Sequence, residues 1–215
     1  MRNRWFIALA AIGLHISIGS VYAWSVLTRP IMAAMGFTLS QTTWTFSLAI
    51  LMLGLSAGFL GSFAEKIGPK KSGLIAMLFW VTGLLGTAYA LSIHNLTLLY
   101  LFYGIIGGIG LGIGYITPVS TLVKYFPNRP GFATGLAIMG FGFASLIAGP
   151  LMQYLVTQVG LVDTFIILGV IYLVIMGASS LYLKAPQPKQ PPRTTQDKST
   201  MYVHNHGMLA NDAMK

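Results

Sequence analysis

The sequence contains no cysteine and little charge. Of its 215 residues, 8% are Asp, Glu, Lys or Arg and 55% are hydrophobic. The absence of cysteine excludes disulfide bonds, thiolate metal ligands and a cysteine nucleophile. Soluble domains are about a quarter charged, so this chain lacks the polar residues needed to cover a water-facing surface. The composition therefore predicts an integral membrane protein.

Acidic residues are especially scarce. Four Asp and Glu accompany thirteen Lys and Arg, which gives a formal net charge of +9. The basic residues lie in short segments between apolar runs and in the C-terminal segment, where such residues set topology and meet anionic lipid headgroups. A nucleic-acid surface would need them clustered on one face of a soluble fold. We therefore expect membrane lipid, and no nucleic acid, as a partner.

The patterns typical of membrane enzymes and channels are also missing. The sequence has no His-Glu-x-x-His, no Gly-x-Ser-x-Gly and no acidic pair inside an apolar run, so it lacks the usual intramembrane hydrolase chemistry. It has neither the paired Asn-Pro-Ala half-helices of water channels nor the acidic rings of cation channels. We expect neither an enzyme nor a channel, and no cofactor or metal ion.

Six apolar runs are long enough to cross a bilayer, which takes about 20 residues each. They predict spans near 5–27, 44–64, 72–91, 96–118, 131–156 and 164–183. The first run exceeds the roughly 7–15 residues of a signal-peptide core, so we expect it to be retained; Thr28-Arg29-Pro30 should end it. Residues 1–184 are thus predicted to form an all-α transmembrane bundle, and the polar, proline-rich residues 185–215 a disordered cytoplasmic linker or tail.

The charges are distributed unevenly between the two sides of this six-span pattern. Twelve of the thirteen Lys and Arg fall on one side, and only Arg29 falls on the other. Short loops rich in Lys and Arg stay in the cytoplasm. The sequence therefore predicts a multi-pass protein of the cell membrane with both termini cytoplasmic.

A short basic turn joins the second and third predicted spans. It reads Gly-x3-acid-basic-x-Gly-x-basic-basic, and its six defining residues are Gly61, Glu65, Lys66, Gly68, Lys70 and Lys71. Gly61 would let two helices approach closely, Gly68 with Pro69 would reverse the chain, and Glu65 should pair with Lys66 or with the end of a neighbouring helix. In its spacing and its place after the second span, this turn resembles the conformational latch of the major facilitator superfamily.

Further stretches resemble the oxalate/formate antiporter family within that superfamily. They are residues 3–6, 19–25, 108–115, 124–129 and 131–135, and the likeness extends over roughly residues 3–183. Family members have twelve helices, so the resemblance implies an N-terminal half, with a C-terminal six-helix half or a partner half supplying the rest. Substrate sites of this superfamily lie between two halves that rock to give alternating access.

The function implied by this resemblance is secondary transport of a small organic anion, such as a monocarboxylate or oxalate and formate. The resemblance also implies that the cationic residues that hold carboxylates come from the second half. In agreement, no Lys or Arg lies in the middle of a predicted span. The alternative is a truncated or half-size product that does not transport alone and needs a second six-helix half.

Five residues are candidates for the wall of the substrate cavity. His15, Tyr22 and Ser25 follow an i, i+7, i+10 spacing, which predicts one face of a helix. By resemblance, Tyr22 and Tyr115 match cavity-lining tyrosines of oxalate transporters, whereas Phe141 stands where such members can have Tyr and Val21 where they can have Gln. Because both departures remove hydrogen-bonding groups, a monocarboxylate is as good a candidate as oxalate.

Each of these residues also has a plainer interpretation. The tyrosines can pack between helices with a hydroxyl bonded to a neighbour. His15 is the only His, Lys, Arg, Asp or Glu inside a predicted span, which marks it as a functional candidate. A neutral histidine bonded across a helix interface is nevertheless the commoner case. Small residues also repeat every four positions at Gly104, Gly108 and Gly112, and again at Gly110 and Gly114. Such spacing serves helix packing, and we expect packing inside the bundle rather than a dimer interface.

Overall fold

The computed structural model describes residues 3–186 of the chain. Within this range it contains six helices that are long and apolar enough to cross a membrane, as the hydropathy pattern predicted. The predicted all-α bundle is confirmed. Nearly all of the predicted tail, from residue 187 onward, lies outside the described residues.

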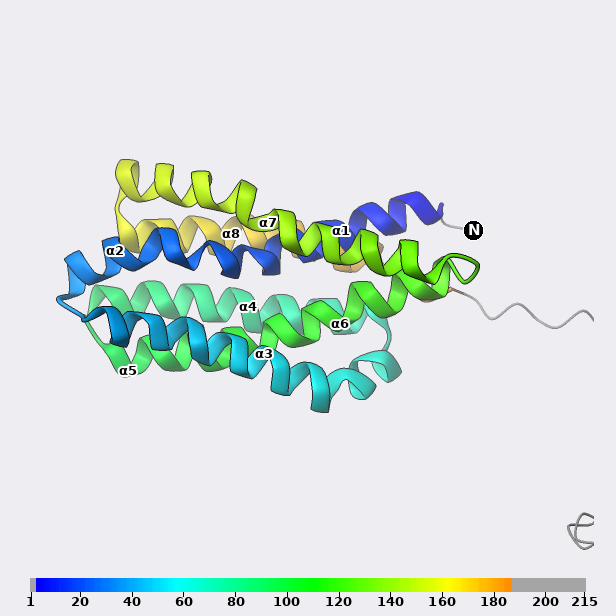
Figure 1. The fold of residues 1–215 in the computed structure, drawn as a ribbon, viewed down its shortest axis with the longest axis horizontal. Coiled ribbons are helices and arrows are strands. Elements are labelled where there is room, and N and C mark those ends of the chain that lie inside the picture. Colours follow the sequence, from blue (N-terminus) through cyan, green and yellow to red (C-terminus); the bar gives the residue numbers. More distant parts are fainter. Residues whose placement is uncertain (1–2, 187–215) are drawn as a thin grey trace, which may run out of the picture.

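Two of the six spans are composite. The first consists of α1 (Arg4–Gly19), the 3-10 segment η1 (Ser20–Ala23) and α2 (Trp24–Met35). The fourth consists of α5 (Leu96–Leu99), the π-helical segment η2 (Tyr100–Gly107) and α6 (Gly108–Tyr125). The others are continuous: α3 (Leu39–Ile67), α4 (Pro69–Ser92), α7 (Pro130–Val159) and α8 (Leu161–Tyr182) (Figure 1).

The expectation that Thr28-Arg29-Pro30 ends the first span is wrong. The helix continues through Pro30 to Met35 and ends at Gly36, whose φ of 69° is the left-handed conformation that glycine adopts readily. A proline removes one backbone hydrogen bond from a helix, and transmembrane helices tolerate this loss where neighbouring groups compensate for it. The apolar run therefore indicated a membrane-spanning helix here, but the proline does not mark the end of that helix.

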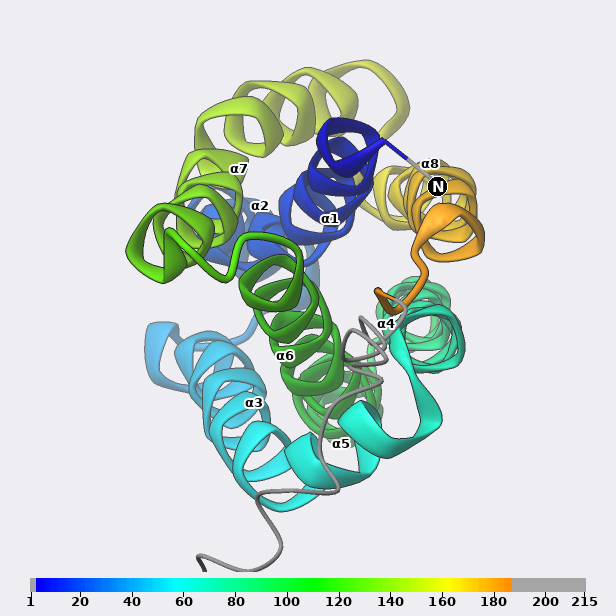
Figure 2. The ribbon, with the colours of Figure 1, turned by 90° about the vertical axis from the view of Figure 1, so that its right-hand side faces the viewer.

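The six spans form two groups that lie side by side. α1–α2, α7 and α8 make one group, and α3, α4 and α5–α6 make the other (Figure 1). α1 packs against α6, α7 and α8, while α6 packs against α1, α3, α4 and α7. In the end-on view these two helices occupy the middle of the bundle (Figure 2). Any site built from α1 and α6 therefore lies near the centre of the molecule.

The glycine repeat of the fourth span packs inside the bundle. A Cβ added at Gly108 would stand 2.6 Å from Cβ of Met52, and one at Gly104 would stand 2.9 Å from Cβ of Leu48. Gly112 approaches the backbone of the same helix, α3, too closely to admit a side chain. These positions let α3 and the fourth span lie in close contact, as small residues do between membrane helices.

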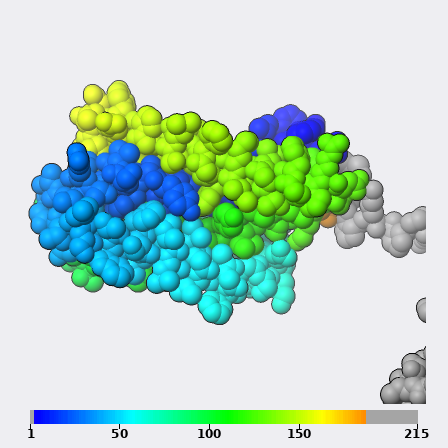
Figure 3. Space-filling model, in the orientation of Figure 1, coloured from blue at the N-terminus to red at the C-terminus, as the bar shows by residue number. Residues whose placement is uncertain are grey.

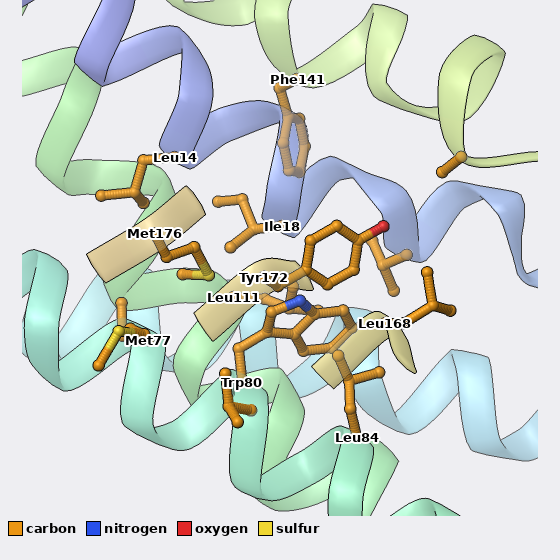
Figure 4. Packing of buried hydrophobic residues seen from close by; sticks show 14 of the residues in the cluster. Leu14, Ile18, Met77, Trp80, Leu84, Leu111, Phe141, Leu168, Tyr172 and Met176 are labelled. Carbon is orange, nitrogen blue, oxygen red and sulfur yellow. The ribbon is translucent and has the colours of Figure 1, made fainter. Parts of the chain in front are cut away.

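A second feature of the core is an aromatic cluster around Tyr103. Its ring centroid lies 4.4 Å from that of Trp24, 5.6 Å from that of Trp80 and 6.3 Å from that of Phe165. Tyr103 belongs to the π-helical segment, and it joins side chains of α2, α4 and α8. Buried side chains from four of the helices meet nearby, as Figure 4 shows for Leu14, Ile18, Trp80, Leu84, Leu111, Leu168, Tyr172 and Met176.

The basic residues gather at one end of the bundle. The N-terminus and the α3–α4 and α6–α7 connections lie at the same end in Figure 1, and the α2–α3, α4–α5 and α7–α8 connections lie at the opposite end. Among residues 3–186, the Lys and Arg side chains at the first end belong to Arg4, Lys66, Lys70, Lys71, Lys124, Arg129 and Lys184, and Arg29 is at the other. Which end faces the cytoplasm stays a prediction.

Candidate functional site

Four of the five predicted cavity residues come together in one aromatic cluster. Phe141 of α7 is at its centre: its ring centroid lies 5.1 Å from that of Tyr22 and 5.2 Å from that of Tyr115, both edge-to-face. The imidazole of His15 lies 5.5 Å from Tyr115, nearly parallel to it, and 5.6 Å from Phe141. Residues more than a hundred positions apart in the sequence thus form a single surface from α1, η1, α6 and α7.

Phe46 extends this cluster, and the sequence did not reveal it. Its ring on α3 lies 6.4 Å from that of Tyr22. Phe46 stands among many apolar residues of the second span, and no spacing or neighbouring polar group distinguishes it. We refer to His15, Tyr22, Phe46, Tyr115 and Phe141 as the aromatic wall.

The aromatic wall is closed at one end and open at the other. His15 is completely buried and Phe141 is 7% exposed, whereas Tyr22 is 45% exposed. The space-filling view shows α6 between α3 and α7 on the side formed by α2, α3 and α7 (Figure 3). The wall therefore presents Tyr22 outward and keeps its imidazole deep inside.

The helical face predicted for His15, Tyr22 and Ser25 is not continuous. The 3-10 segment η1 intervenes, and it makes three residues per turn instead of 3.6, which changes the direction of the side chains that follow. Ser25 is exposed on α2 and makes no hydrogen bond to the other described residues. The structure therefore brings His15 and Tyr22 to a shared partner, Phe141, and leaves Ser25 outside the aromatic wall.

Two glycines allow α1 and α7 to approach at this place. A Cβ added at Gly19 of α1 would stand 2.7 Å from Cβ of Ala144 and would also collide with the carbonyl oxygen of Phe141. A Cβ at Gly140 of α7 would lie 3.6 Å from Cβ of His15. The close approach of the two backbones places the ring of His15 within reach of a backbone carbonyl on α7.

His15 uses both ring nitrogens. Nδ1 lies 2.6 Å from the carbonyl oxygen of Ala137 on α7, and Nε2 lies 3.0 Å from the carbonyl oxygen of Tyr115 on α6. Both contacts are within hydrogen-bond distance. His15 therefore links three helices. This is the arrangement that the sequence left open as one alternative, a histidine hydrogen-bonded across a helix interface.

The structure buries Val21, whereas the comparison with the antiporter family suggested that it lines the cavity. Its side chain is completely buried in the hydrophobic core. The expectation that Val21 removes a hydrogen-bonding group from the cavity is therefore not supported by its position. Of the two positions that differ from the antiporter pattern, Phe141 is the one that lies in the aromatic wall.

The basic turn after α3 has the geometry expected of a tight reversal. Gly68 joins α3 to α4 with a φ of 84°, a conformation that other residues rarely adopt, and Pro69 occupies the first turn of α4. Gly61 is buried and faces Ile116 of α6, where an added Cβ would find a side-chain carbon at 3.5 Å. Lys66 lies in the last turn of α3 and is exposed.

Glu65 forms an ion pair with Lys124, not with Lys66. The carboxylate Oε2 lies 3.5 Å from Nζ of Lys124 in the last turn of α6. Beside this pair is a small cavity of about 40 Å³, lined on its polar side by Thr117, Ser120 and Thr121. The turn is thus tied to the end of the fourth span, while Lys70 and Lys71 are exposed in the first turn of α4.

The charged side chains of the described residues lie mostly at the ends of the helices. In residues 3–186, Lys, Arg, Asp and Glu side chains belong to loops and the terminal turns of helices, apart from Arg29 in α2. No group of three or more His, Asp or Glu side chains in this range is arranged to hold a metal ion. The chemistry available at the aromatic wall is therefore that of two phenol hydroxyls, aromatic faces and one imidazole.

Comparison with known proteins agrees with this architecture. The sequence model of the Major Facilitator Superfamily matches residues 6–210, and the chain therefore belongs to that family of membrane transporters. The resemblance that the turn after the second span first indicated is confirmed. The protein is accordingly a multi-pass integral membrane protein. The six long apolar helices of its described residues correspond to one six-helix half.

Curated relatives show which members of the superfamily the chain is similar to. The chain is 32% identical to an uncharacterized MFS-type transporter, YhjX, of Escherichia coli over 90% of its own length and 47% of the relative's. It is 28% identical to the oxalate:formate antiporter of Oxalobacter formigenes over 79% of its length and 40% of the relative's. The chain is 27% identical to human monocarboxylate transporter 14 over 87% of its own length and 36% of the relative's. The chain spans less than half the length of these relatives.

Proposed function

We propose that this chain forms one half of a secondary active transporter for a small organic anion, a monocarboxylate or oxalate and formate, that works by alternating access. The observation that carries the proposal is the aromatic wall, in which Tyr22 and Tyr115 offer hydroxyl groups beside the ring of Phe141. Ligand sites are mostly apolar with a few placed polar groups. The relatives named for oxalate, formate and monocarboxylates support the same class of substrate.

The electrostatics of the wall are compatible with an anion. In the part of the chain that the structure describes, the two carboxylates, Glu65 and Asp163, belong to helix ends and not to the middle of a span. A carboxylate substrate would therefore meet no like charge at the wall and could accept hydrogen bonds from tyrosine hydroxyls. Such hydrogen bonds to a charged group are stronger than neutral ones.

A second candidate function concerns the chain by itself. The wall is open at Tyr22, and within residues 3–186 no other segment covers that side; α3 also buries little of its surface. These observations support a product that does not transport alone and completes its site with a second six-helix half. The same geometry fits both candidate functions.

The charge distribution supports a location in the cell membrane with both termini in the cytoplasm.

The first experiment separates these two candidates. An antibody against residues 185–205 would show the mass of the native species in its own membrane, for comparison with the 23.2 kDa of the 215-residue chain. A species of about twice this mass contains a second half within the same polypeptide. A species of this mass directs the search to a separate partner half.

The second experiment tests the substrate class. The native protein, with its partner half where there is one, is placed in lipid vesicles, and the uptake of labelled formate, pyruvate, lactate and oxalate is compared with that of protein-free vesicles. Tyr115→Phe removes one hydroxyl from the wall and should raise KM by about tenfold to a hundredfold, the worth of one hydrogen bond to a charged group.

Tyr154→Phe provides the matched control. Tyr154 is on the same helix as Phe141, is 62% exposed, and lies about 20 Å away along the axis. It should keep the KM of the parent protein. Uptake of none of the four anions would overturn the proposed function.

A further inference from the structure

The two hydrogen-bond partners of His15 are of the same kind. Both are backbone carbonyl oxygens, and a carbonyl oxygen only accepts hydrogen bonds. A neutral imidazole has one N–H group, so one of its nitrogens would point a lone pair at a carbonyl lone pair. An imidazolium has two N–H groups and would donate to Ala137 and Tyr115 at once. The two carbonyls therefore fit the doubly protonated ring.

The faces of the ring are also placed to receive a positive charge. Tyr115 is stacked on the imidazole with 24° between the planes, and Phe141 lies at a centroid distance of 5.6 Å. Cations are attracted to aromatic faces within about 6 Å. All four immediate partners of His15, two carbonyl oxygens and two aromatic rings, thus suit an imidazolium.

The protein supplies no counter-ion at this position among the described residues. The titratable groups of the elements packed against α1 are Lys124, Tyr115 and Tyr125 on α6, Tyr154 on α7, Asp163, Tyr172 and Tyr182 on α8, and Tyr22 on η1. Of these, the structure places Tyr115 against the imidazole, and the one carboxylate, Asp163, is in the first turn of α8 at the bundle end. A buried charge without a partner is costly.

We propose that His15 is the positive charge of this wall and that it takes up a proton when a carboxylate anion binds at the aromatic wall. The proposal rests on the proposed function. A proton from the aqueous phase bonds to the ring nitrogen that carries no hydrogen, and the imidazolium then donates to both carbonyl oxygens. The proton returns to the aqueous phase when the anion leaves, and no bond to carbon changes. The anion supplies the missing counter-charge, and the low dielectric of the buried site strengthens the attraction between the two.

This role differs from a purely structural link. A neutral His15 would hold α1, α6 and α7 together equally well in the empty and the occupied site, and anion binding would not depend on pH through this residue. An imidazolium that forms with the anion makes binding weaker as protons become scarce. The dependence of KM on pH therefore distinguishes the two roles.

The test uses labelled pyruvate, which remains an anion over the whole range, and vesicles that contain the native protein. KM is measured between about pH 5 and 8, where histidine changes its charge. With one proton taken up per anion, KM should rise about tenfold per pH unit on the alkaline side. His15→Gln should give a raised KM that stays flat with pH, and His94→Gln, at the α4–α5 connection, should keep the parent profile.

Each outcome has a distinct meaning. No uptake by the parent protein contradicts the proposed function. Uptake with a KM that does not depend on pH, or an unchanged pH profile in His15→Gln, overturns the role of His15 and leaves the transport function standing. Where His15→Gln is inactive, nitrogen NMR of the parent protein with labelled imidazole decides: a doubly protonated His15 that increases with added pyruvate supports the proposal, and a neutral ring under both conditions overturns it.

Discussion

Glu65 and Lys124 connect the ends of two helices that are adjacent in space and 59 positions apart in the sequence. The oxygen of Glu65 lies 3.5 Å from the nitrogen of Lys124, and the two side chains are 46% and 49% exposed. Exposed ion pairs contribute about 0–1 kcal/mol to stability. The pair is therefore too weak to hold the fold together, and it suits a contact that would form and break in the proposed transport cycle.

This relationship leads to a charge-exchange prediction. Glu65→Lys alone places a third positive charge beside Lys66 and Lys124, so we expect a lower uptake rate with a change in unfolding free energy of about 1 kcal/mol or less. Glu65→Lys combined with Lys124→Glu restores the pair with its signs reversed. The double variant should recover most of the uptake rate, and a rate no better than that of Glu65→Lys would count against a latch.

A second prediction concerns Lys70 and Lys71. Their replacement by Glu removes two positive charges from a short loop on the basic side and should impair membrane insertion or switching. Because the parent chain has no cysteine, a single cysteine introduced at Ser92, at the opposite end, reports the topology by labelling with an impermeant maleimide. Lys70→Arg with Lys71→Arg keeps the charge and serves as the control. Normal topology with undiminished uptake in the Glu variant would refute the latch assignment.

A third prediction concerns the close contact of α1 and α7. Gly19→Ala puts a methyl group against Cβ of Ala144 and the backbone of Phe141, so it should destabilise the bundle by about 1–3 kcal/mol, as overpacking does. Gly142→Ala, on α7 with nothing within 4 Å of the new methyl, should be neutral or slightly stabilising. Thermal unfolding in detergent, followed by tryptophan fluorescence, measures both. Equal melting temperatures would show that the approach at Gly19 is not tight.

A fourth prediction concerns selectivity. Phe141→Tyr adds a hydroxyl at the centre of the aromatic wall, where oxalate-transporting members can have tyrosine. We expect the ratio of oxalate to pyruvate uptake to rise about tenfold to a hundredfold, the worth of one hydrogen bond to a charged group. Phe143→Tyr, two positions along the same helix and 57% exposed, is the control. A ratio that is the same in all three proteins would show that this ring does not face the substrate.

Local patterns in the sequence predicted most of the fold. The number of spans, the uneven charge of the two ends and the reversal at Gly68 follow from runs of apolar residues, from the positions of Lys and Arg, and from a glycine beside a proline. Each depends on residues that are close together in the chain. The end of the first span was predicted less well, because Pro30 is tolerated inside a helix that the bilayer and its neighbours stabilise.

The candidate site was predicted only in part. Tyr22, Tyr115, His15 and Phe141 were chosen from a helical spacing and a family resemblance, and the structure brings them together. Phe46 had no distinguishing signal in the sequence. Ser25 is exposed, as Tyr22 is, and its place in the site stays a prediction.

The sequence by itself determined that this chain belongs in a membrane, how many times it crosses, and where its charges lie. Hydropathy and charge act on each segment separately, so these properties need no knowledge of which helices touch. Only the tertiary structure decided that Glu65 meets Lys124 and that His15 lies between two carbonyl groups and two aromatic rings. Those contacts depend on how closely α1, α6 and α7 approach one another, which is set by packing across the whole bundle.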